Sequence, residues 1–241
     1  MFVLMSDFDL NDPYLGQVKA VLHHACPNVP IIDLFSNLPA YQIQAAAYLL
    51  PAYCVTFPDN SIFLCIVDPG VGSEREIALV RANEQWFIGP DNGLFTLLAR
   101  FATIDIYGHV RWQPLQLSNS FHGRDWMAPI AVKLALGQAI EMQTVDEPNA
   151  QYAHWPDDWA HITYIDHYGN AMTGIRSQSL HSSQKIIVND TALHYARTFS
   201  EVAEGQCFWY HNSNELVEIA CNQGRAADCL QLKTGDRIVV Q

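Results

Sequence analysis

Short apolar runs alternate with amphipathic segments over residues 1 to about 145. The runs that favour β-strands are residues 2–5, 29–34, 61–67, 77–82 and 86–88. After the first run, Asp12 and Pro13 have the character of a helix N-cap and first helical position. Leu15, Val18 and Leu22 then fall on one helical face. This alternation predicts an α/β domain in which helices flank a central sheet.

The pattern changes near residue 144. The polar stretch 144–150 breaks the periodicity and has the composition of a linker. Beyond it, short apolar runs are separated by turn residues, at 162–165, 185–188, 216–220 and 237–240. We therefore predict two domains: an α/β domain over 1–150 and a smaller all-β domain over 155–241.

Polar side chains follow the predicted strands of the first domain. Asp7 follows the first strand, and Asp68 ends the run 61–67. His122 directly precedes a helical pattern that includes Trp126 and Ile130. Ligands bind at the carboxyl ends of strands in open α/β sheets, so these loops are expected to form one site. Arg124 and Asp125 are interpreted as a capping pair beside it.

Composition narrows the class of protein. The 241 residues are 49% hydrophobic, enough for one large core or two modest ones, and the formal charge is −12. Only 13 Lys and Arg residues are present and they are scattered, which argues against a nucleic-acid partner. The first residues lack the basic region of a signal peptide, and their apolar run is too short for a bilayer. We expect a soluble cytoplasmic protein without membrane partners.

The cysteines and histidines suggest no metal or redox motif. None of the six cysteines forms a C-x-x-C pair, and we interpret all six as reduced, buried thiols. The ten histidines show no metal-ligand spacing, so no metal is predicted. The Gly70-Val71-Gly72 turn lacks the Gly-Lys-Ser/Thr ending of a phosphate loop, and Asp68 beside it would repel phosphate.

Five segments together resemble one enzyme family. They are residues 6–16, 67–75, 89–94, 119–125 and 166–170. In this order they resemble the S-adenosylmethionine hydroxide adenosyltransferases, which are related to fluorinase and chlorinase. The resemblance extends along most of the chain. It implies S-adenosylmethionine as the substrate, no cofactor, and a homotrimer with each site between neighbouring chains.

The resemblance also implies roles for residues of the first domain. Asp68, Arg75 and His122 match the group that handles hydroxide: Arg75 favours the anion, His122 accepts or relays a proton, and Asp68 orients Arg75 or takes the water proton. Asp7 matches the carboxylate that binds the ribose hydroxyls, and Asp12 matches a second carboxylate of the pocket. Tyr41 and Phe57 match two aromatic residues at the site. Helix capping is the competing interpretation for the second carboxylate, and ordinary core packing for the two aromatic residues.

In the second domain, the resemblance assigns Asn170 to an adenine contact and Asp166 to the methionine amine. Ser213 and Asn214 match the position that holds the methionine carboxylate, although Arg is frequent at the second position in the halogenating branch. The stretch 221–224 matches a loop along the adenine edge. Asp9 replaces a usual Gly and is expected to add a charge near the adenosyl pocket.

These features favour hydrolysis of S-adenosylmethionine to adenosine and methionine by displacement at C5′ with a water-derived hydroxide. The leaving group is a neutral thioether, so the reaction requires an aligned nucleophile more than a general acid. A chlorinase-like halogenase and a non-catalytic adenosyl-ligand sensor are the alternatives. The His122-Gly123 pair and the short link from Arg75 to Trp86 argue against the halogenase.

Overall fold

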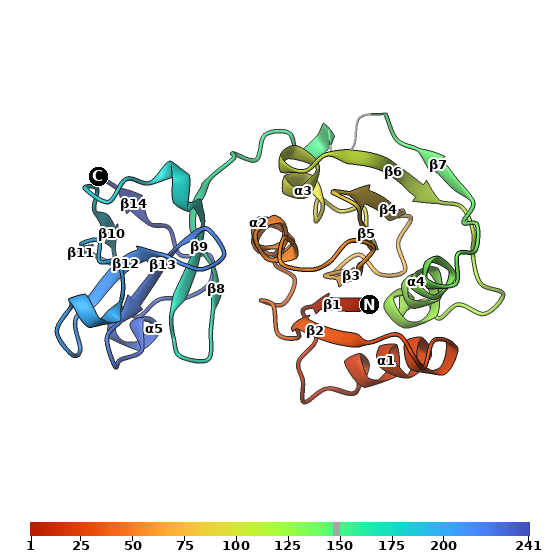
Figure 1. The fold of residues 1–241 in the computed structure, drawn as a ribbon, viewed down its shortest axis with the longest axis horizontal. Helices are drawn as coiled ribbons and strands as arrows, with labels where there is room; N and C mark the ends of the chain where they lie inside the picture. The colour runs from red at the N-terminus through yellow and green to blue at the C-terminus, as the bar shows by residue number, and fades with distance from the viewer. Residues whose placement is uncertain (147–149) are drawn as a thin grey trace. The chain divides into compact units, whose positions relative to one another are not determined.

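A computed structural model of the protein describes residues 1–146 and 150–241, which form two compact units, Met1–Ala153 and His154–Gln241 (Figure 1). The predicted linker 144–150 falls where the first unit ends. Its residues 147–149 lie outside the described residues. The fold class is confirmed: a mixed α/β unit is followed by a smaller unit built mainly from antiparallel strands.

The first unit contains a seven-stranded mixed sheet in the order β2-β1-β3-β5-β4-β6-β7. Its strands are β1 (Phe2–Ser6), β2 (Ile31–Phe35), β3 (Ile62–Ile66), β4 (Ile77–Ala82), β5 (Gln85–Pro90), β6 (Ile104–Val110) and β7 (Met142–Thr144). The first four in the sheet order are parallel, and β4, β6 and β7 pair antiparallel with their neighbours. All five predicted strands are present. The sequence did not identify β6, which contains Asp105 and Gly108, or β7, which is only three residues long.

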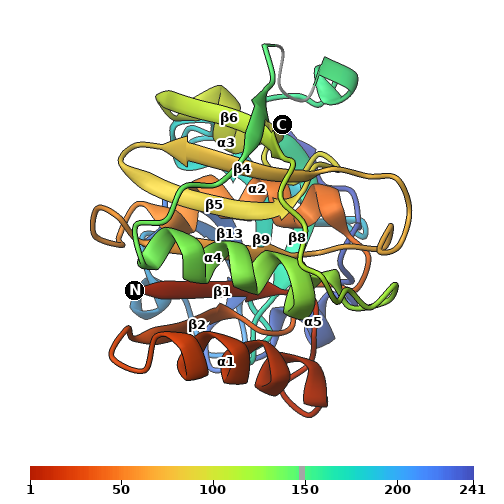
Figure 2. The same cartoon turned by 90° about the vertical axis from the view of Figure 1, so that its right-hand side faces the viewer.

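Helices cover both faces of this sheet. They are α1 (Pro13–Ala25), α2 (Ile43–Cys54), α3 (Thr96–Phe101) and α4 (Ala128–Ala135). Figures 1 and 2 show α1 and α4 together on one face, and α2 and α3 on the opposite face. Leu15, Val18 and Leu22 are buried, as the α1 periodicity predicted. The predicted helix after His122 begins as a π-helical turn, Gly123–Met127, and continues into α4.

The second unit contains two antiparallel sheets. The strands β12 (Cys207–His211), β13 (Leu216–Cys221), β9 (Ala171–Arg176) and β8 (Trp159–Ile165) form the larger sheet in that order. The smaller sheet has the order β11 (Thr191–Leu193), β10 (Ile186–Val188) and β14 (Val239–Val240). Each predicted run overlaps a strand. A single turn of helix, α5 (Ala226–Cys229), follows β13. Trp209, Val217 and Ile219 are fully buried between these elements.

The expectation of six reduced, buried thiols is wrong for three residues. Cys207 and Cys221 face each other across β12 and β13 and form a disulfide, and Cys229 is an exposed thiol. The pairing depends on the strand register, which a search for C-x-x-C spacing does not detect. The other cysteines are free and buried, as expected. Burial raises the pKa of the Cys54 thiol to about 12.

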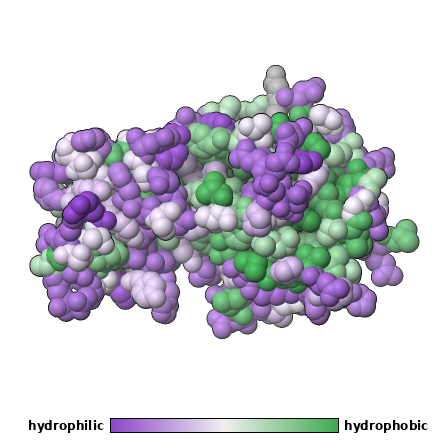
Figure 3. Space-filling model, in the orientation of Figure 1, coloured by the Kyte–Doolittle hydropathy of each residue, from purple (hydrophilic) through white to green (hydrophobic). Residues whose placement is uncertain are grey.

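The surface is uneven in polarity. In the view of Figure 3, apolar residues reach the surface chiefly on the N-terminal unit, and the C-terminal unit presents mostly hydrophilic residues. No helix within the described ranges combines the length and the apolar character that crossing a membrane requires.

Candidate active site

Two carboxylates lie at adjacent strand ends of the N-terminal sheet. β1 and β3 are parallel neighbours, with Ser6 paired to Ile66, so the chain leaves both strands at the same edge. Asp7 follows β1 directly, and Asp68 comes two residues after β3. The backbone N of Asp7 donates to O of Ile66 over 3.3 Å. The pairing of β1 with β3 therefore places the backbone of Asp7 and of Asp68 at the same edge of the sheet.

A glycine-rich turn leads from Asp68 back into the sheet. Oγ of Ser73 donates to O of Gly70 over 2.7 Å and closes the turn. Gly72 has a φ of +81°, and a Cβ at this position would lie only 2.4 Å from O of Asn119. Glycine is required here by conformation and by space. The close approach brings the loop that leads to His122 against this turn.

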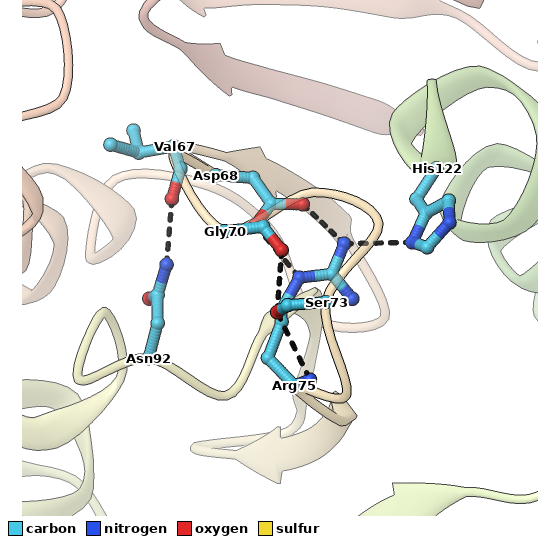
Figure 4. A network of polar contacts seen from close by, with 7 residues as sticks. All are labelled: Val67, Asp68, Gly70, Ser73, Arg75, Asn92 and His122. Carbon is cyan, nitrogen blue, oxygen red and sulfur yellow. Dashed lines mark hydrogen bonds and ion pairs between the residues drawn. The ribbon is translucent and has the colours of Figure 1, made fainter. Parts of the chain in front are cut away.

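Asp68 and Arg75 form a two-point ion pair, shown in Figure 4. Nε of Arg75 donates to Oδ1 of Asp68 over 2.7 Å, and Nη2 donates to Oδ2. The side chains of Arg75 and Asp68 are only 9% and 6% exposed, respectively. A bidentate pair with so little solvent contact holds both groups in a fixed orientation.

The same Nη2 atom of Arg75 also lies 3.0 Å from Nδ1 of His122. A guanidinium can only donate, so Nδ1 must accept and the neutral ring carries its proton on Nε2. Burial, followed by the charge of Arg75, holds the pKa of His122 below its ordinary value. This geometry favours His122 as a neutral hydrogen-bond donor through Nε2. While Nδ1 accepts from Arg75 it is not open to a second proton donor, and the expectation that His122 accepts or relays a proton stays a prediction.

His122 reaches the strand ends because the helix after it begins close to β3. A Cβ on Gly123 would lie 3.0 Å from Cδ1 of Ile66, so a larger residue would push the π-helical turn away. Arg124 and Asp125 pair with each other, and Oδ2 of Asp125 accepts from the backbone N of Ser118 over 3.1 Å. These contacts agree with the pairing of the two residues, but neither side chain caps the helix, because the turn has no side-chain cap hydrogen bond.

A pocket of about 540 Å³ lies over these strand ends, within the volume range of small-molecule sites. Its polar wall includes Asp7, Asp68 and His122, so the structure brings the three predicted loops together. Arg75 is not among the lining residues and lies behind Asp68 and His122. Within the part of the chain that the structure describes, its buried Nη1 atom has no hydrogen-bond partner.

At Asp12 the structure agrees with the pocket interpretation and disfavours the capping one, whereas Asp9 does not lie where the sequence interpretation expected it. Asp12 occupies the N-cap position of α1, but its side chain makes no capping hydrogen bond and instead lines the pocket. Asp9 does not line the pocket. Its Oδ1 accepts from the backbone N and the side-chain Nδ2 of Asn11 over 2.8 and 2.6 Å. The extra charge at Asp9 is therefore directed into its own turn.

The two predicted aromatic residues have different surroundings. Tyr41 lines the pocket, is 75% exposed, and has a left-handed φ of 65°. Its backbone N donates to Oδ2 of Asp7 over 3.0 Å, so this uncommon conformation helps to hold the carboxylate. Phe57 is not a lining residue. Its ring packs edge-on against Phe63 at 5.3 Å, which agrees with core packing.

Sequence reasoning missed three aromatic residues of the pocket. Phe8, Tyr14 and Phe121 all line it, and their ring centroids lie 5.5–5.9 Å apart. Phe8 directly follows Asp7, and Phe121 directly precedes His122. This adjacency to candidate polar residues was the available signal. The cluster provides an apolar part of the pocket wall.

In the second unit, Asp166 and Asn170 close the turn between β8 and β9. The backbone N and side-chain Nδ2 of Asn170 donate to the carboxylate of Asp166 over 2.8 and 3.2 Å. Gly169 between them has a φ of +80°. These predicted binding residues thus hold one another in place.

Ser213 and Asn214 lie in the turn between β12 and β13. Oδ1 of Asn212 accepts from the backbone N of Asn214 and of Leu216, each over 3.0 Å. Nδ2 of Asn212 in turn donates to the buried carboxylate of Glu218 over 2.8 Å. Sequence reasoning did not identify Glu218 as a support of this turn.

Comparison with known families agrees with this geometry. The model of the SAM hydroxide adenosyltransferase N-terminal domain matches residues 2–144, and that of the C-terminal domain matches residues 160–239. The chain belongs to the SAM hydroxide adenosyltransferase family. The resemblance inferred from the five sequence segments is confirmed.

Relatives within the SAM hydroxide adenosyltransferase family cover nearly the whole chain. An (R)-S-adenosyl-L-methionine hydrolase of Thermus thermophilus is 35% identical, with 96% of this chain and 95% of the relative aligned. A protein of the same name from Salinispora arenicola is 31% identical, with 98% of this chain and 95% of the relative aligned. A fluorinase of Nocardia brasiliensis is more distant, at 22% identity, with 100% of this chain and 96% of the relative aligned.

Solved structures show the same fold. A conserved protein of Thermotoga maritima superposes with a TM-score of 0.87 at 26% identity, covering all of both chains. A conserved protein of Thermus thermophilus has a TM-score of 0.77 at 32% identity, covering 100% of this chain and 99% of the other.

Proposed function

We propose that this protein hydrolyses S-adenosyl-L-methionine to adenosine and L-methionine, by attack of a water-derived hydroxide at C5′. The observation that carries the proposal is that Asp68 and His122, both bound to the buried Arg75, line one pocket together with Asp7. The relatives' names support the same substrate, and they specify the (R) configuration at sulfur. We propose that this protein also acts on the (R) epimer of S-adenosyl-L-methionine.

The reaction needs a well-placed oxygen nucleophile. The C5′–O bond forms as the C5′–S bond breaks, and sulfur leaves with the electron pair as the neutral thioether of methionine. Asp68 accepts a hydrogen bond from the attacking water and then takes its proton. Holding the water in line with C5′–S supplies about 7 kcal/mol or more of the rate enhancement.

His122 and Arg75 have distinct roles in this proposal. Nε2–H of His122 donates to the water oxygen and fixes its position, since Nδ1 is occupied by Arg75. Arg75 does not line the pocket, so it acts through its two neighbours. Its charge stabilises the developing hydroxide and keeps the imidazole neutral.

Substrate contacts follow from the chemistry of the remaining residues. Asp7 is a bidentate acceptor suited to the two ribose hydroxyls, and Asp12 and Tyr41 extend the same wall. We propose that Asn170 contacts adenine, Asp166 the methionine amine, and Ser213 and Asn214 the methionine carboxylate. Phe57 is left out of the site because its ring packs on Phe63.

We further propose a homotrimer in which each site combines the first unit of one chain with the second unit of its neighbour. Exposed apolar side chains support burial by a partner: the lining residues Tyr14 and Tyr41 are 46% and 75% exposed, and Leu10, in the loop between the lining residues Phe8 and Asp12, is 68% exposed. Co-assembly of Asp68→Asn chains with Asn170→Ala chains tests this. Mixed trimers recover activity only if one site draws on two chains.

Incubation of the purified protein with each sulfur epimer of S-adenosyl-L-methionine, followed by chromatography, tests the reaction. Adenosine and methionine are expected, and in ¹⁸O-labelled water the label should appear in the 5′ hydroxyl of adenosine. Unlabelled adenosine would contradict displacement at C5′.

The two alternatives have their own signatures in the same assay. Addition of chloride would yield 5′-chloro-5′-deoxyadenosine from a halogenase. Tight binding without any product would favour an adenosyl-ligand sensor. His122→Ala should lose turnover while its ligand affinity stays within about twofold of wild type, because the proposed role of His122 concerns water and not the substrate.

A further inference from the structure

Three cysteine sulfurs gather where β13 ends in the second unit. Cys207 and Cys221 are joined in a disulfide, and the Sγ atom of the exposed Cys229 lies within 4.8 Å of both sulfurs. A Cβ placed on Gly224 would lie 3.4 Å from Cβ of Cys221 and 3.9 Å from Sγ of Cys229. Gly224 therefore lies in van der Waals range of both Cys221 and the thiol of Cys229.

We propose that these three residues form a thiol–disulfide exchange centre, in which the thiolate of Cys229 attacks the Cys207–Cys221 disulfide. A new S–S bond forms between Cys229 and Cys221, and the old bond breaks. Cys207 leaves with the electron pair and takes a proton from solvent, which replaces the proton that Cys229 lost. The step conserves one disulfide and one thiol, so it needs no oxidant or reductant.

Solvent exposure determines which sulfur is attacked. Cys221 is 1% exposed, whereas Cys207 is partly exposed. A thiolate leaving at Cys207 is hydrated, and one at Cys221 would be desolvated at a high cost. Attack at Cys221 with departure of Cys207 is therefore the favoured direction. Cys229 is the only exposed cysteine among the described residues, so its sulfur is accessible to solvent.

A thiolate metal site is the competing use of three clustered cysteines. Structural zinc sites take four protein ligands. Across residues 1–146 and 150–241, this group contains three ligand side chains and no fourth His, Cys, Asp or Glu. Two of the three sulfurs are already bonded to each other. Exchange therefore accounts for the cluster better than metal binding does.

The exchange centre is connected to the turn that carries Asp166 and Asn170. The segment between Cys221 and Cys229 packs on that turn: N of Ala227 donates to O of Gly169 over 2.9 Å, and Arg225 donates to O of His167. A Cβ on Gly169 would lie 2.7 Å from Cβ of Arg225, so the packing leaves no free space. A Cys221–Cys229 bond ties both ends of this segment together and shifts its contacts with the turn.

Disulfide mapping tests the centre without reference to activity. The protein is equilibrated in a buffer of oxidised and reduced dithiothreitol, quenched with acid, alkylated with N-ethylmaleimide and digested without reduction. Trypsin cleaves after Arg225, and chymotrypsin cleaves after Trp209 or Tyr210, so each cysteine falls in its own peptide. Mass spectrometry should find both Cys207–Cys221 and Cys221–Cys229 linkages.

Single substitutions isolate each linkage. Cys207→Ser should leave Cys221 bonded to Cys229, and Cys229→Ser should leave only the Cys207–Cys221 bond. Cys54→Ser is the matched control, because Cys54 is in the first unit and its Sγ donates to O of Pro51, which a serine hydroxyl can also do. It should preserve both linkages. Two free thiols at Cys221 and Cys229 in oxidised Cys207→Ser would overturn the proposal, as would one zinc ion per chain held by all three thiols.

The effect on substrate binding rests on the proposed function. Cys207→Ser and Cys229→Ser represent the two disulfide states, and their KM values for S-adenosyl-L-methionine should differ at least about fivefold. Equal KM values would refute the connection to the Asp166–Asn170 turn. Absence of hydrolysis in wild-type protein would refute the function alone, because the mapping is read from peptides.

Discussion

Nη2 of Arg75 donates to Oδ2 of Asp68 and, over 3.0 Å, to Nδ1 of His122. One guanidinium nitrogen therefore links the carboxylate and the imidazole, and both of its hydrogens are used. The link fixes the ring tautomer and keeps the imidazole neutral, so the role of His122 depends on Arg75.

Arg75→Met should destabilise the protein by about 3–5 kcal/mol, because it leaves the carboxylate of Asp68 buried and unpaired. Urea denaturation measures this loss, and the double variant Arg75→Met/Asp68→Asn should recover part of it. Arg111→Met is the control: Arg111 forms a half-exposed pair with Glu76, and its loss should cost less than about 1 kcal/mol. Equal losses for Arg75→Met and Arg111→Met would contradict a buried, oriented pair.

Acid should inactivate the enzyme by protonating His122. Because burial and Arg75 lower its pKa, kcat/KM should rise with pH through a midpoint below the ordinary imidazole value of about 6.5. Replacement of Arg75 by Met removes one of the lowering effects and should move this acid limb to higher pH. NMR titration of the ring in both proteins provides the direct measurement, and an unchanged pKa would contradict the assigned contact.

The same shift predicts how stability depends on pH. Between the lowered folded pKa of His122 and its ordinary value, the unfolded chain binds more protons than the folded chain, so stability rises with pH. The contribution is complete above about pH 6.5 and is lost as pH falls through the folded pKa. Free energies of unfolding at about pH 7.5 and pH 5.5 should differ less in His122→Asn than in wild type.

Sequence patterns located the site because its residues follow strands. The apolar runs ending before Asp7 and Asp68 define both strand ends, and parallel pairing of neighbouring strands makes those ends adjacent. No sequence pattern determines which ring nitrogen of His122 faces Arg75, because that depends on how closely the Gly123 turn approaches Ile66. The fold was therefore more predictable than the protonation chemistry.

Side-chain direction accounts for the remaining differences. Asp12 has the sequence context of an N-cap, yet only the path of the loop decides that its carboxylate lines the pocket. The disulfide of Cys207 and Cys221 depends on the register of β12 and β13, which joins residues 14 positions apart. Such pairings are set by tertiary packing and not by local sequence.

Asp7→Asn should lower kcat/KM by about 10- to 100-fold, corresponding to the loss of a charge-assisted contact of about 1.5–3 kcal/mol to the ribose. Burial raises the pKa of Asp7, so the variant also removes a desolvated charge and should not destabilise the fold at neutral pH. Asp9→Asn is the matched control, since Asp9 bonds only within its own turn, to Asn11. Steady-state kinetics should show the control within about twofold of wild type.

Glu218 should support the turn of Ser213 and Asn214 through Asn212. Its carboxylate accepts from Oη of Tyr210 and Nδ2 of Asn212 over 2.6 and 2.8 Å. Glu218→Gln places an amide where both partners donate, so one hydrogen bond is lost. We expect KM for S-adenosyl-L-methionine to rise about 3- to 10-fold while kcat stays within about twofold of wild type. A less well-held turn weakens substrate binding equally in the ground state and the transition state. A fall in kcat at unchanged KM would contradict this role.

The pH dependence of stability provides a second test of Glu218. Burial raises its pKa above the ordinary value of 4.5, so the folded chain binds more protons than the unfolded chain in that interval. The stability that wild type gains from the protonated carboxyl is present below pH 4.5 and is lost as pH rises through the raised pKa. Glu218→Gln cannot titrate, so its free energy of unfolding should fall less over this range in urea titrations. An identical pH profile in the two proteins would show that the carboxyl titrates normally and that its burial imposes no electrostatic cost.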